Sequence, residues 1–111
     1  MPAETFPKVL AQLRPADTNA ASLYSPPDNT VTEITKLVIC NTTNGGLAFR
    51  VFLDDDGTTY DQTTALYYDE ALAANTTVEI GIGWGMRNPA GNLAVRSSAN
   101  DGLTFTLFGK E

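Results

Sequence analysis

Residues 34–53 have the sequence ITKLVICNTTNGGLAFRVFL, and this stretch decides the fold class. In its first part, Leu37 and Ile39 alternate with Val38 and Cys40. Apolar side chains therefore leave both faces of the segment, as they do in a strand that is covered on both sides. The polar segment 41–46 follows, and its two glycines predict a turn with positive φ.

After this turn, apolar side chains return at every second position, at Leu47, Phe49, Val51 and Leu53. A helix would bring its apolar stripe back every three or four residues, so the spacing indicates a second strand. The two strands and the turn between them predict a hairpin at the centre of a β protein.

Six further segments show the features of short strands, and they lie at 9–13, 21–25, 65–69, 77–84, 93–97 and 103–108. Turn residues separate them, and no segment has a convincing helical period. With the two strands above, the chain has about eight strands. We predict an all-β fold, a single antiparallel β-sandwich of the jelly-roll-like type, because the connections range from tight turns to long loops.

The most regular of these strands define a predicted core, made of Phe49, Val51, Val78, Ile80, Ile82, Phe105 and Leu107. Residues 1–8 differ, because Pro2 and Pro7 surround Phe6 in a segment too short to bury itself. We expect residues 1–8 to form an extended N-terminal arm that reaches a neighbouring chain, and residues 9–111 to form the sandwich domain.

Composition limits the classes of partner. The chain of 111 residues fits one domain, and its net charge of −6 disfavours nucleic acid as a partner. It has neither a run of apolar residues that would span a membrane nor a signal-peptide pattern at its N-terminus. Cys40 stands alone, which predicts no disulfide framework and fits synthesis in a reducing cytoplasm.

The sequence also lacks the usual catalytic constellations. It has no histidine, and Cys40 lies in an apolar strand, where a thiol behaves as a small hydrophobe. The glycines of GIGWG at 81–85 lie in a strand pattern and lack the helix and the Lys-Ser/Thr end of a phosphate loop. We therefore expect a protein that is not an enzyme and that needs no cofactor.

Two remaining groups of residues are candidates for binding. Asp54, Asp55, Asp56 and Asp61 could form a weak calcium site, but their spacing misses the EF-hand pattern, so we favour a turn and expect no metal. The candidate interface residues are Phe6, Trp84, Met86 and Arg87, since Trp, Met and Arg are enriched where protein surfaces meet. The alternative for Trp84 is that it continues the buried face of its strand, and for Met86 that it fills a gap at the end of the sandwich.

Seven segments carry a resemblance to a known family: LYSPP at 23–27, TKLVICN at 35–41, AFRV at 48–51, ALYYD at 65–69, LAANT at 72–76, VRSSAN at 95–100 and TFTLFG at 104–109. In this order they resemble the small β-structured virion proteins of tailed bacteriophages, which include capsid decoration (cement) proteins. The resemblance covers residues 20–109.

The resemblance implies a structural role, with the major capsid protein as partner and a homo-oligomer, favoured as a homotrimer, on the outer surface of the capsid. It also implies synthesis in the cytoplasm of a host bacterium. The alternative is a phage tail or receptor-binding module that contacts host glycans through Tyr60, Tyr67, Tyr68 or Trp84.

Overall fold

The computed structural model describes residues 7–111, and at Ile82 it describes the backbone alone. This part of the chain forms eight strands: β1 (Lys8–Leu13), β2 (Ala21–Tyr24), β3 (Thr32–Asn41), β4 (Leu47–Asp54), β5 (Ala65–Leu72), β6 (Thr77–Met86), β7 (Asn92–Ser97) and β8 (Leu103–Lys110). None of the described residues forms a helix, so none provides a helix that could cross a membrane. The all-β prediction is confirmed.

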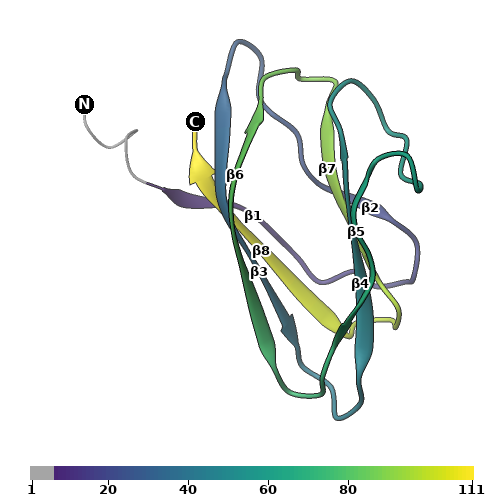
Figure 1. Ribbon diagram of the computed structural model, residues 1–111. Helices are drawn as coiled ribbons and strands as arrows, with labels where there is room; N and C mark the ends of the chain where they lie inside the picture. The colour runs from purple at the N-terminus through teal and green to yellow at the C-terminus, as the bar shows by residue number, and fades with distance from the viewer. Residues whose placement is uncertain (1–6) are drawn as a thin grey trace.

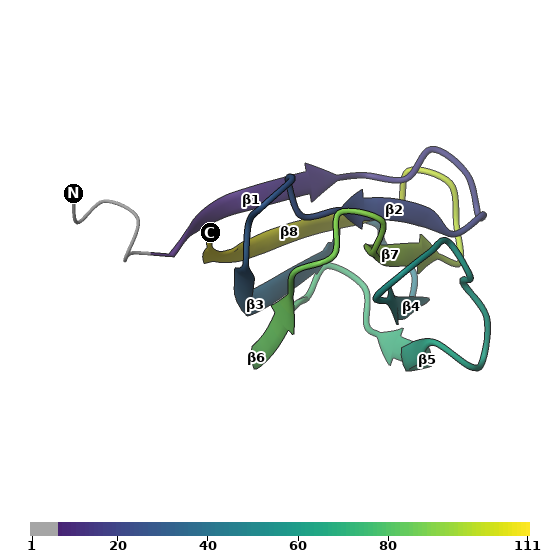
Figure 2. The same ribbon diagram turned by 90° about the horizontal axis from the view of Figure 1, so that it is seen from above.

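The strands form two four-stranded sheets, ordered β1-β8-β3-β6 and β2-β7-β4-β5, and all their pairings are antiparallel. Figures 1 and 2 show the two sheets as separate layers that face each other. The chain passes from one sheet to the other after every strand except β4, which is followed by its own neighbour β5. Interleaved pairs of this kind make up a jelly roll, so the predicted sandwich and its type are both confirmed.

The predicted central hairpin is wrong. β3 pairs with β6 and β8, whereas β4 pairs with β5 and β7, so the loop between them crosses from one sheet to the other. Two strands that face each other in different sheets bury alternate residues, just as two strands paired in one hairpin do. The alternation of apolar residues therefore could not distinguish a hairpin from a crossover between sheets. The glycines of this loop also lack positive φ, which occurs instead at Asn29, Asp69, Asn75 and Asp101.

The inward faces of both sheets form one apolar core. Of the predicted core residues, Phe49, Val51, Ile80, Phe105 and Leu107 are buried in it. Val78 is half-buried and packs against this core, while the side chain of Ile82 lies outside the described part of the structure.

One buried amide joins two loops where β3 ends. The Asn41 side chain is 1% exposed, and its Nδ2 donates towards the carbonyl oxygens of Gly45, Leu72 and Ala73 at 3.0, 3.1 and 3.2 Å. Its Oδ1 accepts from the backbone N–H of Thr43 at 2.9 Å. Asn41 thus fixes the crossover loop against the β5–β6 connection.

A second buried polar group lies at the other end of β3. The Tyr24 hydroxyl shares a hydrogen bond of 2.7 Å with Thr32 Oγ1 and donates to Glu111 Oε2 at 2.6 Å. Glu111 also forms an ion pair of 3.1 Å with Lys8. Burial, followed by the hydrogen bond to Glu111, raises the pKa of Tyr24 to about 12.

Candidate functional site

The outer face of the β2-β7-β4-β5 sheet carries two arginines directly opposite each other. Arg50 of β4 pairs in register with Arg96 of β7. Like charges in such cross-strand positions repel, so the pair needs a compensating group. Asp69 of β5 supplies it: Arg50 donates to both carboxylate oxygens, at 2.6 and 3.1 Å, and Arg96 Nη1 lies 3.7 Å from Oδ1.

A bulge in β5 brings Asp69 to this position. Phe49 pairs with Glu70 and Val51 pairs with Tyr67, so Tyr68 and Asp69 both lie opposite Arg50. Such a bulge re-aims side chains at a sheet edge. Asp69 has a φ of 56°, in the left-handed region that Asp tolerates better than most residues. The bulge therefore converts a repulsive arginine pair into a three-residue ion cluster.

Tyr68 completes the cluster, and we call Arg50, Tyr68, Asp69 and Arg96 the arginine patch. The guanidinium carbon of Arg50 lies 3.9 Å from the centre of the Tyr68 ring, within cation–π range. The hydrogen bond from Arg50 is the main cause of a lowered pKa at Asp69, with a smaller contribution from Arg96. Asp69 is therefore a carboxylate at neutral pH.

Aromatic packing beneath the patch holds it in place. Phe52 points to the outer face of β4, yet it is only 1% exposed. The rings of Tyr60 and Tyr68 cover it, with centroids 6.2 and 6.4 Å away, and Ala94 lies opposite it and is fully buried. The loop from β4 to β5 thus folds over this sheet and forms a small second apolar cluster beside the arginines.

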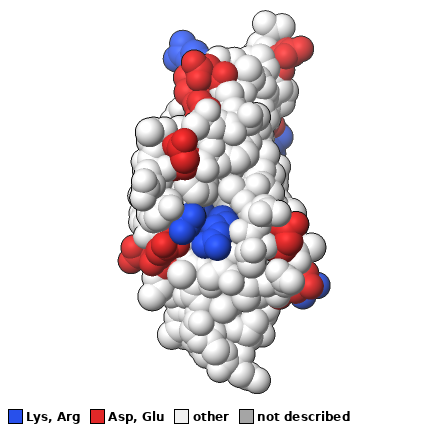
Figure 3. Space-filling model, turned by 90° about the vertical axis from the view of Figure 1, so that its right-hand side faces the viewer, with Lys and Arg blue, Asp and Glu red and all other residues white. Residues whose placement is uncertain are grey.

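The arginine patch keeps unused hydrogen-bonding capacity. Arg96 Nε donates to the Thr18 carbonyl at 2.8 Å. Within residues 7–111, Nη2 of Arg96 has no hydrogen-bond partner, and Nη1 of Arg96 has only the ion pair of 3.7 Å with Asp69. Nε and Nη2 of Arg50 bind Asp69, which leaves Nη1 of Arg50 beside the Tyr68 ring. Two cations share one carboxylate, so the patch carries one uncompensated positive charge. Figure 3 shows this face with a compact group of blue atoms near its middle.

The predicted interface residues that the structure describes differ in exposure. Met86 is 2% exposed and belongs to the core, so its side chain is not available on the surface for a partner. Trp84 is half-buried against the same core, in agreement with the alternative that its strand pattern suggested. Arg87 is exposed just beyond β6, and Phe6 lies outside the described residues.

The acidic loop after β4 uses its carboxylates to build turns. Asp54 accepts from the backbone N–H groups of Thr59, at 2.8 Å, and Asp56, at 3.2 Å. Asp61 accepts from the backbone N–H of Thr63 at 2.8 Å. The two backbone bonds lower the pKa of Asp54. The pKa of Asp61 is lowered mainly by the hydrogen bond from the Thr63 hydroxyl, at 2.6 Å, and then by the backbone bond. No group of three or more potential metal ligands occurs among the described residues.

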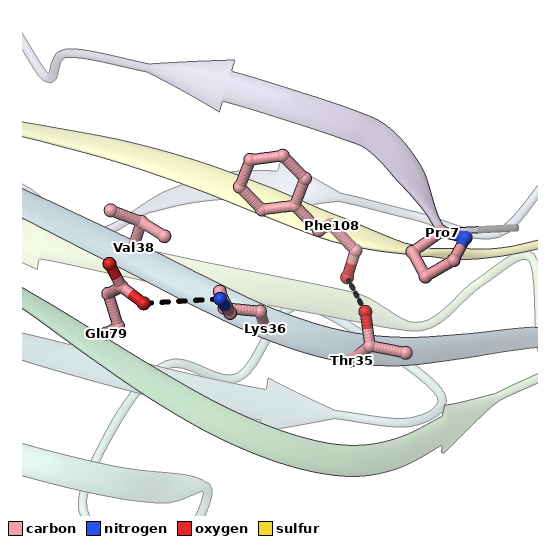
Figure 4. A pocket seen from close by; sticks show the side chains of 6 residues that line it. All are labelled: Pro7, Thr35, Lys36, Val38, Glu79 and Phe108. Atoms are coloured by element: carbon pink, nitrogen blue, oxygen red, sulfur yellow. Dashed lines mark hydrogen bonds and ion pairs between the residues drawn. The ribbon is translucent and has the colours of Figure 1, made fainter.

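The opposite sheet carries a groove of about 410 Å³ on its outer face, lined by Pro7, Thr35, Lys36, Val38, Glu79 and Phe108. Figure 4 shows that Lys36 and Glu79 reach across it to each other, with Nζ and Oε1 3.2 Å apart. The charges in the groove are therefore paired, whereas the arginine patch keeps an excess positive charge. The arginine patch is the better candidate site.

The residues of the patch are ordinary in sequence, and sequence reasoning missed them. Arg50 falls on the outward positions of a predicted strand, which is where solvated charges belong. Only the register of three strands and the bulge in β5 bring Arg50, Asp69 and Arg96 together. A bulge leaves no clear mark in a single sequence.

The chain was also compared with known proteins. No protein-family model matches it, and neither does any curated protein. Solved structures do match. One is the T13 viral particle of infectious bursal disease virus, with a TM-score of 0.55 and 13% identity, over 96% of this chain and 30% of that chain.

Two further structures of the same virus also match. The virus of the Gx strain has a TM-score of 0.52 and 16% identity, over 93% of this chain and 32% of that chain. The VP2 subviral particle has a TM-score of 0.54 and 17% identity, over 94% of this chain and 31% of that chain. This chain spans about a third of those chains, and at these identities the likeness establishes one thing, a shared fold with proteins of viral particles.

Proposed function

We propose that this chain is a structural virion protein without enzymatic activity, which decorates a tailed-phage capsid from outside and stabilises it by bridging neighbouring subunits. The observation that carries the proposal is the jelly roll itself, which matches chains of viral particles over nearly its whole length. A protein that binds only the assembled shell stabilises that state by mass action. The major capsid protein is the proposed partner, and a homotrimer the proposed assembly.

The charge of the chain supports an outer position. A protein with a net charge of −6 would be repelled by packaged DNA, whereas the outside of the shell imposes no such penalty.

The alternative is a tail module that contacts glycans, and only Tyr60 and Tyr68 remain to support it. Tyr67 packs against the core, as Trp84 does. Tyr68 already has an arginine against its ring, and both remaining tyrosines cover Phe52. Stacking on a sugar would require a free ring face, so we favour the capsid role.

Immunoelectron microscopy of virions from the virus that encodes this chain tests the proposal. Antibody against the chain should label heads, evenly over the shell. Label restricted to tails or fibres would favour the alternative, and virions that lack the chain altogether would contradict both functions.

A further inference from the structure

We propose that the arginine patch is the surface through which this chain docks on its shell partner, and that it receives an acidic side chain, Asp or Glu, of that partner. The inference rests on the proposed function and adds to it the docking face and the chemistry of the group recognised. The proposal gives the residues of the arginine patch a binding role, whereas their outward positions in the strand pattern indicate only contact with solvent.

The first argument is the arrangement of charge. Opposed like charges cost stability in a sheet, and a left-handed non-glycine residue in a strand is also costly. The patch combines both features, at the Arg50–Arg96 pair and at Asp69. Asp69 offsets the repulsion only in part, because one carboxylate faces two guanidinium groups. Departures of a fold from local preference are commonly found at functional sites.

The second argument is the geometry of the unused donors. The side chains of Arg50 and Arg96 are about a quarter exposed, at 24% and 25%, so both guanidinium groups are partly shielded from water and still reachable by a partner. A guanidinium binds a carboxylate through two parallel N–H donors, and this is stronger than a neutral hydrogen bond. One excess positive charge matches one incoming carboxylate.

The third argument concerns the class of partner. A polyanion would meet the repulsion of a chain with net charge −6. A single acidic side chain on a protein surface meets only the local field of the patch. Arginine and tyrosine dominate the energetics of protein interfaces, and Tyr68 is 40% exposed beside Arg50.

Three variants test the proposal on capsids assembled without this chain, with the fraction bound measured by co-sedimentation over a range of protein concentrations. Arg96→Glu should weaken binding by about tenfold or more. Asp69→Asn should tighten it, because the amide keeps an acceptor and tolerates positive φ while the competing charge is lost. Lys36→Glu makes the same charge change at an exposed site on the opposite sheet and should leave binding unchanged.

The opposite signs of the first two variants separate docking from a structural role, since a loss of stability would weaken binding in both. The melting temperature of each variant is measured alongside. If Arg96→Glu fails to fold, Arg96→Gln replaces it, because the glutamine amide retains a donor for the Thr18 carbonyl. Arg96→Gln should then weaken capsid binding, while Asp69→Asn should still tighten it.

The outcomes distinguish the two proposals. If the unaltered chain does not bind capsids, the proposed function fails and the docking face with it. If it binds, and Arg96→Glu and Asp69→Asn bind equally well, the docking face alone is overturned. A third outcome is that Arg96→Glu binds capsids normally but no longer binds immobilised hyaluronate, which the unaltered chain does bind. That result would assign the arginine patch to an acidic glycan and would also overturn the proposed docking face.

Discussion

At the scale of single residues, two buried polar side chains hold the ends of the sandwich. Asn41 bonds the crossover loop to the β5–β6 connection, and Tyr24 joins β2 to Thr32 and to Glu111. Buried polar groups stabilise a fold only while their partners are complete, because an orphaned donor or acceptor costs more than a hydrogen bond gains.

We expect Asn41→Ala to lower the free energy of unfolding by about 2–3 kcal/mol. The substitution leaves the Leu72 carbonyl and its neighbours without their donor. Urea denaturation measures the change. Asn44→Ala is the matched control, because its exposed side chain accepts one bond within residues 7–111, from Asn75 at 3.1 Å, and its loss should cost less than about 1 kcal/mol. Equal losses for both variants would show that Asn41 has no special role.

Tyr24 should make stability fall at alkaline pH. Its pKa is raised to about 12, so the folded protein keeps a proton that the unfolded chain releases near pH 10. The contribution is complete below about pH 10 and is lost as pH rises towards about 12. Between about pH 9 and about pH 11.5 the unaltered chain should lose roughly 1–2 kcal/mol more than Tyr24→Phe. Parallel losses in urea titrations would contradict this origin.

At the scale of elements, the strands follow from alternation of apolar side chains. β8 is the clearest case, because Leu103, Phe105 and Leu107 are fully buried while the residues between them are half-exposed. Phe108 belongs to the other set and lines the groove on the outer face.

Phe105→Ala should therefore cost about 3–5 kcal/mol of stability, by loss of buried surface and creation of a cavity. Phe108→Ala removes the same atoms from the outer face of the same strand and should cost clearly less. Thermal denaturation of the two variants provides the comparison. Similar melting temperatures of the two variants would contradict the placement of Phe105 in the core and Phe108 on the outer face.

The elements also show how far a single sequence can predict this fold. Alternation and turn residues located all eight strands, and the alternation identified Phe49, Phe105 and Ile80 as core. It did not reveal which sheet a strand joins, so β3 and β4 were assigned to one hairpin. It also missed the β5 bulge and with it the arginine patch, because both depend on register between strands distant in sequence.

At the scale of the whole molecule, the two sheets leave two outer faces of different character. One carries the arginine patch, and the other carries the groove with its paired Lys36 and Glu79. If the arginine patch docks on the shell, the β1-β8-β3-β6 sheet faces solvent.

The N-terminal arm is expected to contribute to assembly and not to folding of the domain. β1 begins at Lys8, so deletion of residues 1–6 leaves every strand intact. The melting temperature should stay unchanged, while oligomerisation or capsid binding weakens. Sedimentation velocity and capsid co-sedimentation measure these effects, and unimpaired assembly of the truncated chain would show that residues 1–6 take no part.

The central claim, a position on the outside of the capsid, is tested most directly by labelling intact virions with a membrane-impermeant amine reagent. Peptide mass spectrometry then follows Lys8, Lys36 and Lys110. The side chains of Lys8 and Lys36 are 61% and 46% exposed, and both lie on the sheet opposite the arginine patch. We predict that both are modified while the heads remain closed. Protection of all three lysines until the heads are broken open would place the protein inside the capsid and contradict the account.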